Sequence, residues 1–372
     1  MTYMSSKGFI QDFLTTADIT INGTRPWDIQ VHNEKLYDKV LAKGSLGLGE
    51  AYMDGWWDAI ELDQFFVHLM SAKIPSRFMY NPVLVWTALK ARITNLQLTR
   101  AFEVGEKHYD AGNDLYKAML DRRMTYTCGY WKDANTLDEA QEAKLDLVCR
   151  KIGLKPGQNI LDIGSGWGSF LNFAGEKYDA RGIGVSVSKE QVAYANSVRV
   201  SDKVESRLMD YHDVQGTFDH VVSIGMFEHV GYKNYRSYMQ KVYDVLSDDG
   251  YFLLHTIGSY VTTTHADPWI DKYIFPNGML PSIAQIGTAI EKLFIMEDWH
   301  NFGPYYDLTL MQWFKNFDTH WPELRDKYDD RFYRMWKYYL LSCAGGFRCG
   351  QIELWQIVLS KHGTIGGYQS IR

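Results

Sequence analysis

The alternation of apolar and polar positions changes character near residue 139. Beyond that point, short apolar runs alternate with amphipathic stretches of helical period. The apolar runs predict strands at 159–163, 182–187, 204–209, 219–224 and 251–255, and the amphipathic stretches predict helices at 138–152, 169–177, from 189 and at 232–246. Strands that alternate with helices predict an α/β fold with a doubly wound, mostly parallel sheet. Its ligand crevice is expected outside the carboxyl ends of the strands.

The N-terminal part of the chain has a different pattern. Residues 18–23 and 27–31 alternate like short strands around the turn-forming Asn22-Gly23, and helical patterns follow at 33–43 and 60–71. We therefore expect a smaller mixed α/β N-terminal domain. The whole chain divides into a small domain at 1–80, a basic linker helix at 81–104 and a large domain at 105–372.

A glycine-rich segment, residues 44–50, lies within the small domain. It has no strand before it and a helical pattern does not clearly follow, so we interpret it as a tight loop and not as a phosphate cradle.

Residues 73–107 carry six basic and two acidic side chains, interleaved with aromatic and aliphatic ones. This pattern suits a helix that rests on an anionic lipid surface. A solvated helix between domains explains it equally well, and both interpretations stay open.

Composition excludes several classes of protein. Lys plus Arg is 39 and Asp plus Glu is 45, for a net charge of -6, so general binding of nucleic acid is not expected. The four cysteines form no CxxC pair and no ligand spacing with histidine, so we expect neither a disulfide framework nor a metal site, and a reducing cytosol. The polar start and the lack of ~20 consecutive apolar residues argue against export and membrane spanning.

A glycine turn follows the first strand of the large domain, with glycines at 164, 166 and 168. Glycine lets the backbone approach a ligand closely, and Asp162 supplies an acceptor at the strand end. The dinucleotide pattern GxGxxG is not matched, and the next strand ends in SVSKEQ (186–191) without an acidic residue at its end. These features favour S-adenosylmethionine (SAM) over NAD. Tyr211 and the adjacent Asp210 offer a ring and a carboxylate suited to adenine.

Longer motifs give the chain a resemblance to the cyclopropane-fatty-acyl-phospholipid synthases, SAM-dependent bacterial enzymes with a Rossmann-like methyltransferase fold. The motifs are GSLGLGEAYMDGWW (44–57), GEKHYDAGND (105–114), YTCGYW (126–131), LDIGSGWG (161–168), GMFEHVG (225–231), HTIG (255–258), PWIDKYIFPNG (268–278) and MEDWHNFG (296–303). Together they span nearly the whole chain.

The resemblance implies a set of SAM contacts. These are the positions of Tyr126, Thr127, Gly164, Ser165, Gly166, Ser186, Val187, Ser188, Lys189, Glu190, Gln191, Tyr211 and His212. The family usually has Cys at the position of Ser165, and since both side chains are small we expect binding to survive.

The resemblance also implies a bound bicarbonate ion that acts as the catalytic base. Its ligands would be Cys128, Glu228, His255, the backbone of Ile257, and Tyr306. Bicarbonate keeps one hydroxyl proton that a carboxylate can accept, while His, Tyr and backbone N–H groups can donate to its oxygens. Taken singly, each residue has an ordinary structural interpretation, such as a core histidine or a buried thiol. A Cys–His nucleophile pair is also conceivable, but methyl transfer needs no covalent enzyme intermediate.

The implied reaction is methylene transfer from SAM across the cis double bond of an unsaturated acyl chain in a membrane phospholipid. An alkene is a weak nucleophile, so near-attack geometry in a dry pocket would have to drive the reaction. Aromatic faces would stabilise the resulting carbocation until bicarbonate removes a proton and the cyclopropane ring closes. Candidate aromatic residues for this pocket are Phe275, Trp299, Phe302, Tyr305 and the residues at 313–317.

The resemblance further implies a cytoplasmic homodimer that contacts the inner face of the membrane peripherally, with residues 9–80 serving docking or dimer contact. Two alternatives remain at this stage. One is a SAM methyltransferase acting on a small amine or another soluble acceptor, and the other is a lipid-binding protein without catalysis.

Overall fold

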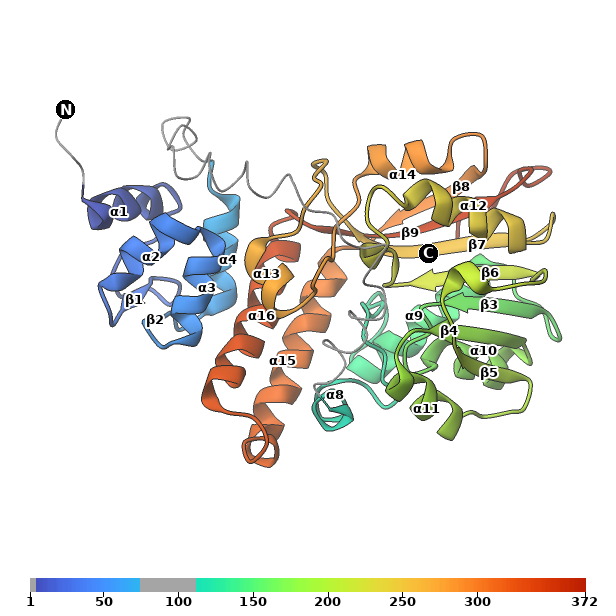
Figure 1. Ribbon diagram of the computed structural model, residues 1–372, viewed down its shortest axis with the longest axis horizontal. Coiled ribbons are helices and arrows are strands. Elements are labelled where there is room, and N and C mark those ends of the chain that lie inside the picture. The colour runs from blue at the N-terminus through green and yellow to red at the C-terminus, as the bar shows by residue number, and fades with distance from the viewer. Residues whose placement is uncertain (1–4, 74–111) are drawn as a thin grey trace. The chain divides into compact units, whose positions relative to one another are not determined.

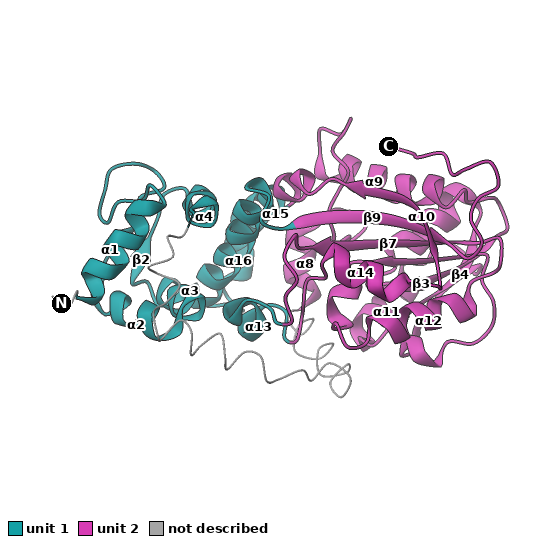
Figure 2. Cartoon of the chain, turned by 90° about the horizontal axis from the view of Figure 1, so that it is seen from above, with its two compact units in different colours: residues 1–95, 265–276, 310–352 teal, residues 96–264, 277–309, 353–372 magenta. Residues whose placement is uncertain are grey.

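The computed structural model describes residues 5–73 and 112–372 (Figure 1). It forms two compact units, each assembled from separate stretches of sequence (Figure 2). The first unit comprises residues 1–95, 265–276 and 310–352, and the second comprises 96–264, 277–309 and 353–372. The expected domain boundary at residue 80 and the expected linker helix at 81–104 lie outside the described residues.

The first unit is mainly helical. Its elements are α1 (Ser6–Thr16), β1 (Gln30–Val31), α2 (Lys35–Lys43), α3 (Ser45–Met53), β2 (Trp57–Asp58), α4 (Leu62–Ser71), α13 (Pro268–Tyr273), α16 (Asp330–Arg348) and the greater part of α15 (Pro304–Leu324). The helices predicted at 33–43 and 60–71 are confirmed. Aromatic side chains fill the core, where Trp57, Phe65 and Tyr338 pack edge to face or tilted.

The strand predicted at 18–23 is wrong. Its one ladder contact is a parallel bridge from Ile21 to Ile29, and β1 pairs instead with β2 in antiparallel fashion. The buried carboxylate of Asp28 explains the difference, because it accepts backbone N–H bonds from Thr20 (2.8 Å) and Arg25 (2.9 Å). Side-chain capping of this kind competes with strand pairing.

The tight loop predicted at 44–50 is also wrong, because residues 45–53 form helix α3. The glycines serve close packing. A Cβ on Gly47 would lie 2.3 Å from the backbone oxygen of Lys39 on α2, and one on Gly49 would lie 2.3 Å from the Trp269 ring. The low helix propensity of glycine is therefore outweighed by contacts that a larger side chain would prevent.

The second unit is an α/β layer structure around a seven-stranded sheet (Figure 1). The strands are β3 (Asn159–Ile163), β4 (Arg181–Ser186), β5 (Val204–Leu208), β6 (His220–Ile224), β7 (Tyr251–Gly258), β8 (Ile295–Asn301) and β9 (Glu353–Ser360), in the order β5-β4-β3-β6-β7-β9-β8. The first five are mutually parallel, and β9 is antiparallel to both β7 and β8. The predicted doubly wound, mostly parallel sheet is confirmed.

Helices cover both faces of this sheet. The helices that lie wholly in this unit are α8 (Asn113–Met119), α9 (Leu137–Lys151), α10 (Ser169–Tyr178), α11 (Lys189–Ser197), α12 (Tyr235–Val245) and α14 (Ile283–Ile290), and the 3₁₀ turns are η1 (Tyr211–Asp213) and η2 (Phe227–His229). Alternate strand residues face opposite cores: Leu161 and Phe252 pack with α12 and α14, whereas Ile160 and Leu253 pack with α9 and α10.

The order of the sheet places a topological switch between β3 and β6, because the chain runs outward from β3 to β5 and then resumes on the other side at β6. A crevice at the carboxyl ends of these strands is the usual ligand site of such a sheet. Across the two described stretches of the chain, no helix has the length and apolar character required to span a membrane.

Candidate active site

The turn after β3 is shaped by three glycines in the left-handed region. Gly164, Gly166 and Gly168 have φ values of +82°, +53° and +81°. The backbone N–H groups of Gly164 and Ser165 donate to the carbonyl oxygen of Val185 at 2.9 and 3.1 Å, which ties the turn to β4. A Cβ on Gly164 would meet Met226 Cβ at 2.5 Å. This turn needs glycine, and it leaves room for a ligand over the backbone.

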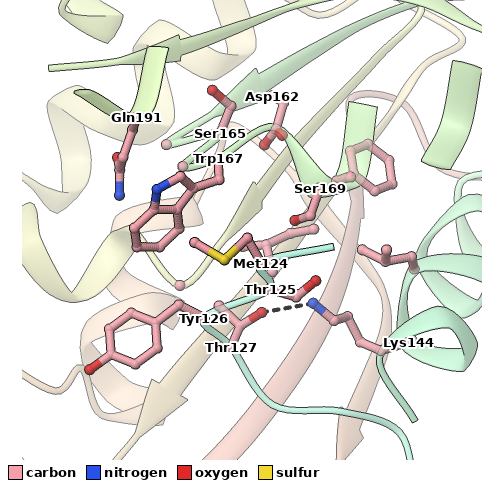
Figure 3. Close-up of a pocket in the computed structure, with 16 residues that line it drawn as sticks. Met124, Thr125, Tyr126, Thr127, Lys144, Asp162, Ser165, Trp167, Ser169 and Gln191 are labelled. Atoms are coloured by element: carbon pink, nitrogen blue, oxygen red, sulfur yellow. Dashed lines mark hydrogen bonds between the residues drawn. The ribbon is translucent and has the colours of Figure 1, made fainter. Parts of the chain in front are cut away.

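A recess opens beside this turn at the β3/β6 switch (Figure 3). The space between its lining atoms is about 500 Å³, including the part open to solvent. Six of the expected SAM contacts line it: Tyr126, Thr127, Gly164, Ser165, Gly166 and Gln191.

The other expected SAM contacts do not line the recess itself. Ser186 and Ser188 are buried supports of Gln191, because the Ser186 hydroxyl donates to Gln191 Oε1 (3.0 Å) and Ser188 Oγ accepts from the Gln191 backbone (3.4 Å). Lys189 and Glu190 start α11 with exposed side chains, next to the half-buried Val187. Their place at the carboxyl end of β4 is as expected, but their contact with a ligand stays a prediction.

Tyr211 and His212 form the 3₁₀ turn after β5. Their rings lie 4.0 Å apart between centroids, and His212 Nδ1 is 2.6 Å from Asp210 Oδ1. The Tyr211 ring also contacts Tyr238 of α12 edge to face. The pair stays a prediction for the adenine contact.

Two charged side chains line the recess, Lys144 and Asp162 (Figure 3). Asp162 is the acceptor expected at the strand end, although it was not among the contacts implied by the resemblance, whereas Lys144 was not expected. Both are buried, and burial lowers the pKa of Lys144 to about 8 and raises the pKa of Asp162 to about 7. Lys144 Nζ donates to Thr127 Oγ1 at 2.7 Å. The sequence contained an indication that Lys144 is buried. It lies on the apolar face of the predicted helix, together with Leu137, Leu145 and Val148.

A second group of residues gathers around the carboxyl ends of β6 and β7. Glu228 Oε1 accepts the backbone N–H of Ile257 at 2.6 Å, while Oε2 is buried without a hydrogen-bond partner among the described residues. His255 Nδ1 lies 3.2 Å from the amide nitrogen of Gln356, and its Nε2 likewise has no partner in the described part. The N–H of Ile257, which we expected to face an anion, thus serves the carboxylate in this structure.

Cys128 is also in this region. Gly225, at the end of β6, donates to the backbone oxygen of His255 (2.9 Å), and a Cβ on Gly225 would lie 2.6 Å from Thr127 Cγ2. The buried Cys128 thiol donates to Gly129 O (3.1 Å) and lies 3.9 Å from Thr309 Oγ1 on α15. Tyr306 is buried one turn before Thr309 on the same helix.

Desolvation dominates the charge states of this second group. Burial raises the pKa of Glu228 to about 7, and the hydrogen bond from Ile257 offsets part of that rise. The pKa of His255 lies well below its usual value because the ring is buried near Lys144, Lys151 and His300, so the ring is neutral. Burial also raises the pKa of Cys128 far above its ordinary value. A protonated Cys128 thiol and a neutral His255 imidazole, with no hydrogen bond between them in the described part of the chain, disfavour the Cys–His nucleophile pair.

Aromatic rings adjoin His255. Phe302 lies 5.8 Å from the His255 ring and 5.4 Å from Tyr130, which in turn lies 5.5 Å from Tyr305. Of the expected aromatic pocket, Phe302 and Tyr305 therefore gather near the second group. Trp299 packs instead on Trp355 at 5.0 Å. Phe275 and residues 313–317 belong to the first unit.

The sheet order and the glycine turn define the fold class of SAM-dependent methyltransferases. The recess fits SAM: it has no Cβ over Gly164 and Gly166, Ser165 Oγ is buried without a partner among the described residues, and Asp162 and Lys144 supply opposite charges. A solved structure of a coclaurine N-methyltransferase bound to SAH shares this fold, with a TM-score of 0.68 and 22% identity over 84% of this chain and 99% of that one.

The model of the mycolic acid cyclopropane synthetase family matches residues 96–357, and the chain belongs to this family. It is 49% identical to the cyclopropane-fatty-acyl-phospholipid synthase of Escherichia coli K12 over 351 residues, covering 94% of this chain and 92% of the relative. The cyclopropane synthase MmaA2 from Mycobacterium tuberculosis superposes with a TM-score of 0.66 at 32% identity, covering 70% of this chain and 98% of that one. These findings confirm the family expected from the motifs and an enzyme that uses SAM.

The glycine turn generates the first prediction. Gly164→Ala forces a side chain into the left-handed region and against Met226, so the turn must shift and the affinity for SAM should fall by about tenfold or more. Calorimetric titration with SAM measures the effect. The matched control is Gly216→Ala, where φ is +98° and no atom lies within 4 Å of the added Cβ. It should lower stability similarly and leave SAM affinity unchanged; equal SAM affinity in both variants would contradict the assignment of the turn.

Proposed function

We propose that this protein transfers a methylene group from SAM across the cis double bond of an unsaturated acyl chain in a membrane phospholipid, forming a cyclopropane ring. The identity to the Escherichia coli synthase over 94% of the chain supports the substrate class. The observation that carries the chemistry is a pair of buried polar atoms without partners among the described residues, Glu228 Oε2 and His255 Nε2. Buried polar atoms normally have hydrogen-bond partners, so these two atoms are suited to bind a polar ligand or water.

The two atoms are complementary to bicarbonate. Gln356 Nε2 is a donor toward His255 Nδ1 as the amide is placed, so the neutral ring carries its proton on Nε2 and donates outward. Glu228 Oε2 accepts when ionised. A bicarbonate ion offers an acceptor oxygen to His255 and a hydroxyl donor to Glu228. When bound, SAM supplies the methyl group and bicarbonate accepts the proton that the methyl loses.

The remaining catalytic work falls to the protein's own residues. Phe302 contacts the His255 ring, and Tyr130 and Tyr305 pack on Phe302. We propose that these rings exclude water and stabilise the substrate carbocation by cation-π attraction. Cys128 and Tyr306 complete the anion site in the proposal. Gly225 joins the two regions, because it lines the recess and its N–H binds the backbone of His255.

Phospholipid acyl chains lie in a bilayer, so the proposed function includes peripheral contact with the inner face of the membrane by a cytoplasmic enzyme. Assembly as a homodimer, and the part of residues 9–80 in docking or dimer contact, stay predictions within this proposal.

The substrate class is tested with SAM and phospholipid vesicles. Vesicles with cis-unsaturated chains should yield S-adenosylhomocysteine together with acyl chains heavier by one CH₂, whereas fully saturated vesicles should yield neither. Mass spectrometry of the released fatty acids checks both. Methylation of a soluble amine in place of the unsaturated lipid would overturn the proposal and favour a methyltransferase of soluble acceptors.

The base is tested by removing carbon dioxide. Turnover should collapse in a rigorously degassed buffer and return on adding bicarbonate, because the two unpaired atoms then regain their ligand. SAM affinity measured in the same buffers serves as the control and should not change. Full turnover without bicarbonate would show that a protein side chain is the base.

Glu228→Gln provides the matching side-chain test. The amide keeps the bond from Ile257 through its oxygen but presents N–H groups where Oε2 accepted, so the hydroxyl of bicarbonate loses its acceptor. We expect turnover to fall by about 100-fold or more with SAM affinity within about twofold.

Wild-type turnover should also decline below about pH 7 as Glu228 becomes protonated. Glu297→Gln, a carboxylate bound to Ser360 and Thr364, is the control and should keep its rate; equal losses of rate and SAM affinity in Glu228→Gln would assign Glu228 to the cofactor.

A further inference from the structure

Helix α9 places two lysines, Lys144 and Lys151, seven residues apart on its buried face. Lys151 points to a cluster on β8, with Nζ 3.1 Å from His300 Nδ1 and 3.5 Å from Asp298 Oδ2. Lys144 lies two turns earlier on the same face and lines the recess, where Nζ donates to Thr127 Oγ1 (Figure 3). Nothing in the proposed mechanism uses Lys144.

A buried ammonium is costly, and one bond to a hydroxyl offsets little of that cost. Among residues 5–73 and 112–372, no carboxylate lies within ion-pair distance of Lys144 Nζ, since Asp121 and Asp162 act on it only at longer range. Asp162 is equally exceptional, because its carboxylate is 2% exposed and forms no hydrogen bond in the described part of the chain. Both charged groups line the recess, so a ligand bound there could pair with each of them.

The charge pattern of SAM matches these two positions. Its amino-acid end carries a carboxylate and an ammonium group, whereas its adenosine end carries no formal charge. The other residues that line the recess are uncharged, so the two charged groups mark the end that takes the zwitterion. We propose that Lys144 is the cofactor-positioning residue of this site: with Asp162 it selects the amino-acid end of SAM, and through Thr127 it fixes the segment that carries Tyr126 and Cys128.

This assignment has a consequence for pH. Lys144 lowers the pKa of Asp162, which burial raises to about 7. Without the lysine charge, the pKa of Asp162 rises further, so the carboxylate becomes neutral at a higher pH and loses its attraction for the ligand ammonium. As the pH is lowered, SAM affinity should therefore begin to fall at a higher pH in a variant that lacks the Lys144 charge than in the wild type.

The experiment compares ligands by calorimetry in the full chain: SAM and S-adenosylhomocysteine, which carry the amino-acid end with and without the sulfonium charge, and 5′-methylthioadenosine, which has neither the amino-acid end nor that charge. In Lys144→Met we expect affinity for SAM and S-adenosylhomocysteine to fall by about tenfold or more and affinity for methylthioadenosine to change by less than about twofold. The control is Lys151→Met, which removes an equally buried lysine from the same helix outside the recess. It should lower thermal stability and leave the ratios of these affinities as in the wild type.

Asp162→Asn keeps the inference testable if Lys144→Met does not fold. It should also lose SAM selectively over methylthioadenosine, and its SAM affinity should lack the decline between about pH 8 and 6 that the protein carboxylate causes in the wild type. Titration of SAM itself is common to all variants and cancels in the comparison. Equal weakening of all three ligands, or an unchanged SAM affinity in Lys144→Met or Asp162→Asn, would overturn the inference and leave the pair a structural role.

Discussion

Desolvation at the carboxyl edge of the sheet is the constraint on which the site depends. Four ionisable residues are buried there: Lys144, Asp162, Glu228 and His255. Burial lowers the pKa of the lysine and the histidine and raises the pKa of the two carboxyl groups, so it favours the neutral form of each. Lys144 then acts on two of the others, because its charge lowers the pKa of both Asp162 and His255. A single buried cation thus helps to keep the carboxylate ionised and the imidazole neutral, and it does so from a helix outside the sheet.

The sheet provides the rigidity that such charges need. Strand β9 runs antiparallel against β7 along eight paired positions, so Gln356 lies directly beside His255 and holds its ring. The same pairing brings the Trp355 ring to Gly258, where an added Cβ would lie 2.1 Å from it. Polar groups that are fixed by strand pairing do not need to reorient when charge develops in the transition state. This preorganisation is the main source of electrostatic catalysis.

The strands and helices of the second unit follow the hydrophobic pattern because each apolar run meets a packed core on the face that its period predicts. The N-terminal part departs from it for local reasons. Asp28 accepts the backbone N–H of Thr20, which a strand at 18–23 would have used. The glycines of α3 permit a close approach to Lys39 and Trp269 that no sequence pattern reveals. The low helix propensity of glycine favours a loop at 44–50, and propensity does not include the tertiary contacts that stabilise the helix there.

The candidate site divides in the same way. The glycine turn follows from the chemistry of close backbone approach, whereas Glu228, His255 and Cys128 came from the resemblance, since a buried polar residue has no local signature. Lys144 was missed because a lysine inside an apolar helical phase looks like an interruption until its burial is known. The bond between Ile257 and Glu228 depends on the spacing of β7 and η2, which sequence does not specify.

The arrangement of the two regions suits an acceptor that carries no proton to be removed before the methyl is transferred. A methyltransferase of amines or alcohols deprotonates its acceptor before or during transfer, so its base must face the acceptor atom. An alkene has no such proton, and in the proposed reaction the proton to be removed belongs to the methyl after transfer. The base must then lie near the incoming methyl but apart from the amino-acid end of SAM. Gly225 lines the recess with Lys144 and Asp162, and its N–H binds the backbone of His255, so the cofactor region and the proposed base region meet at this residue, as a methyl that moves from one to the other requires.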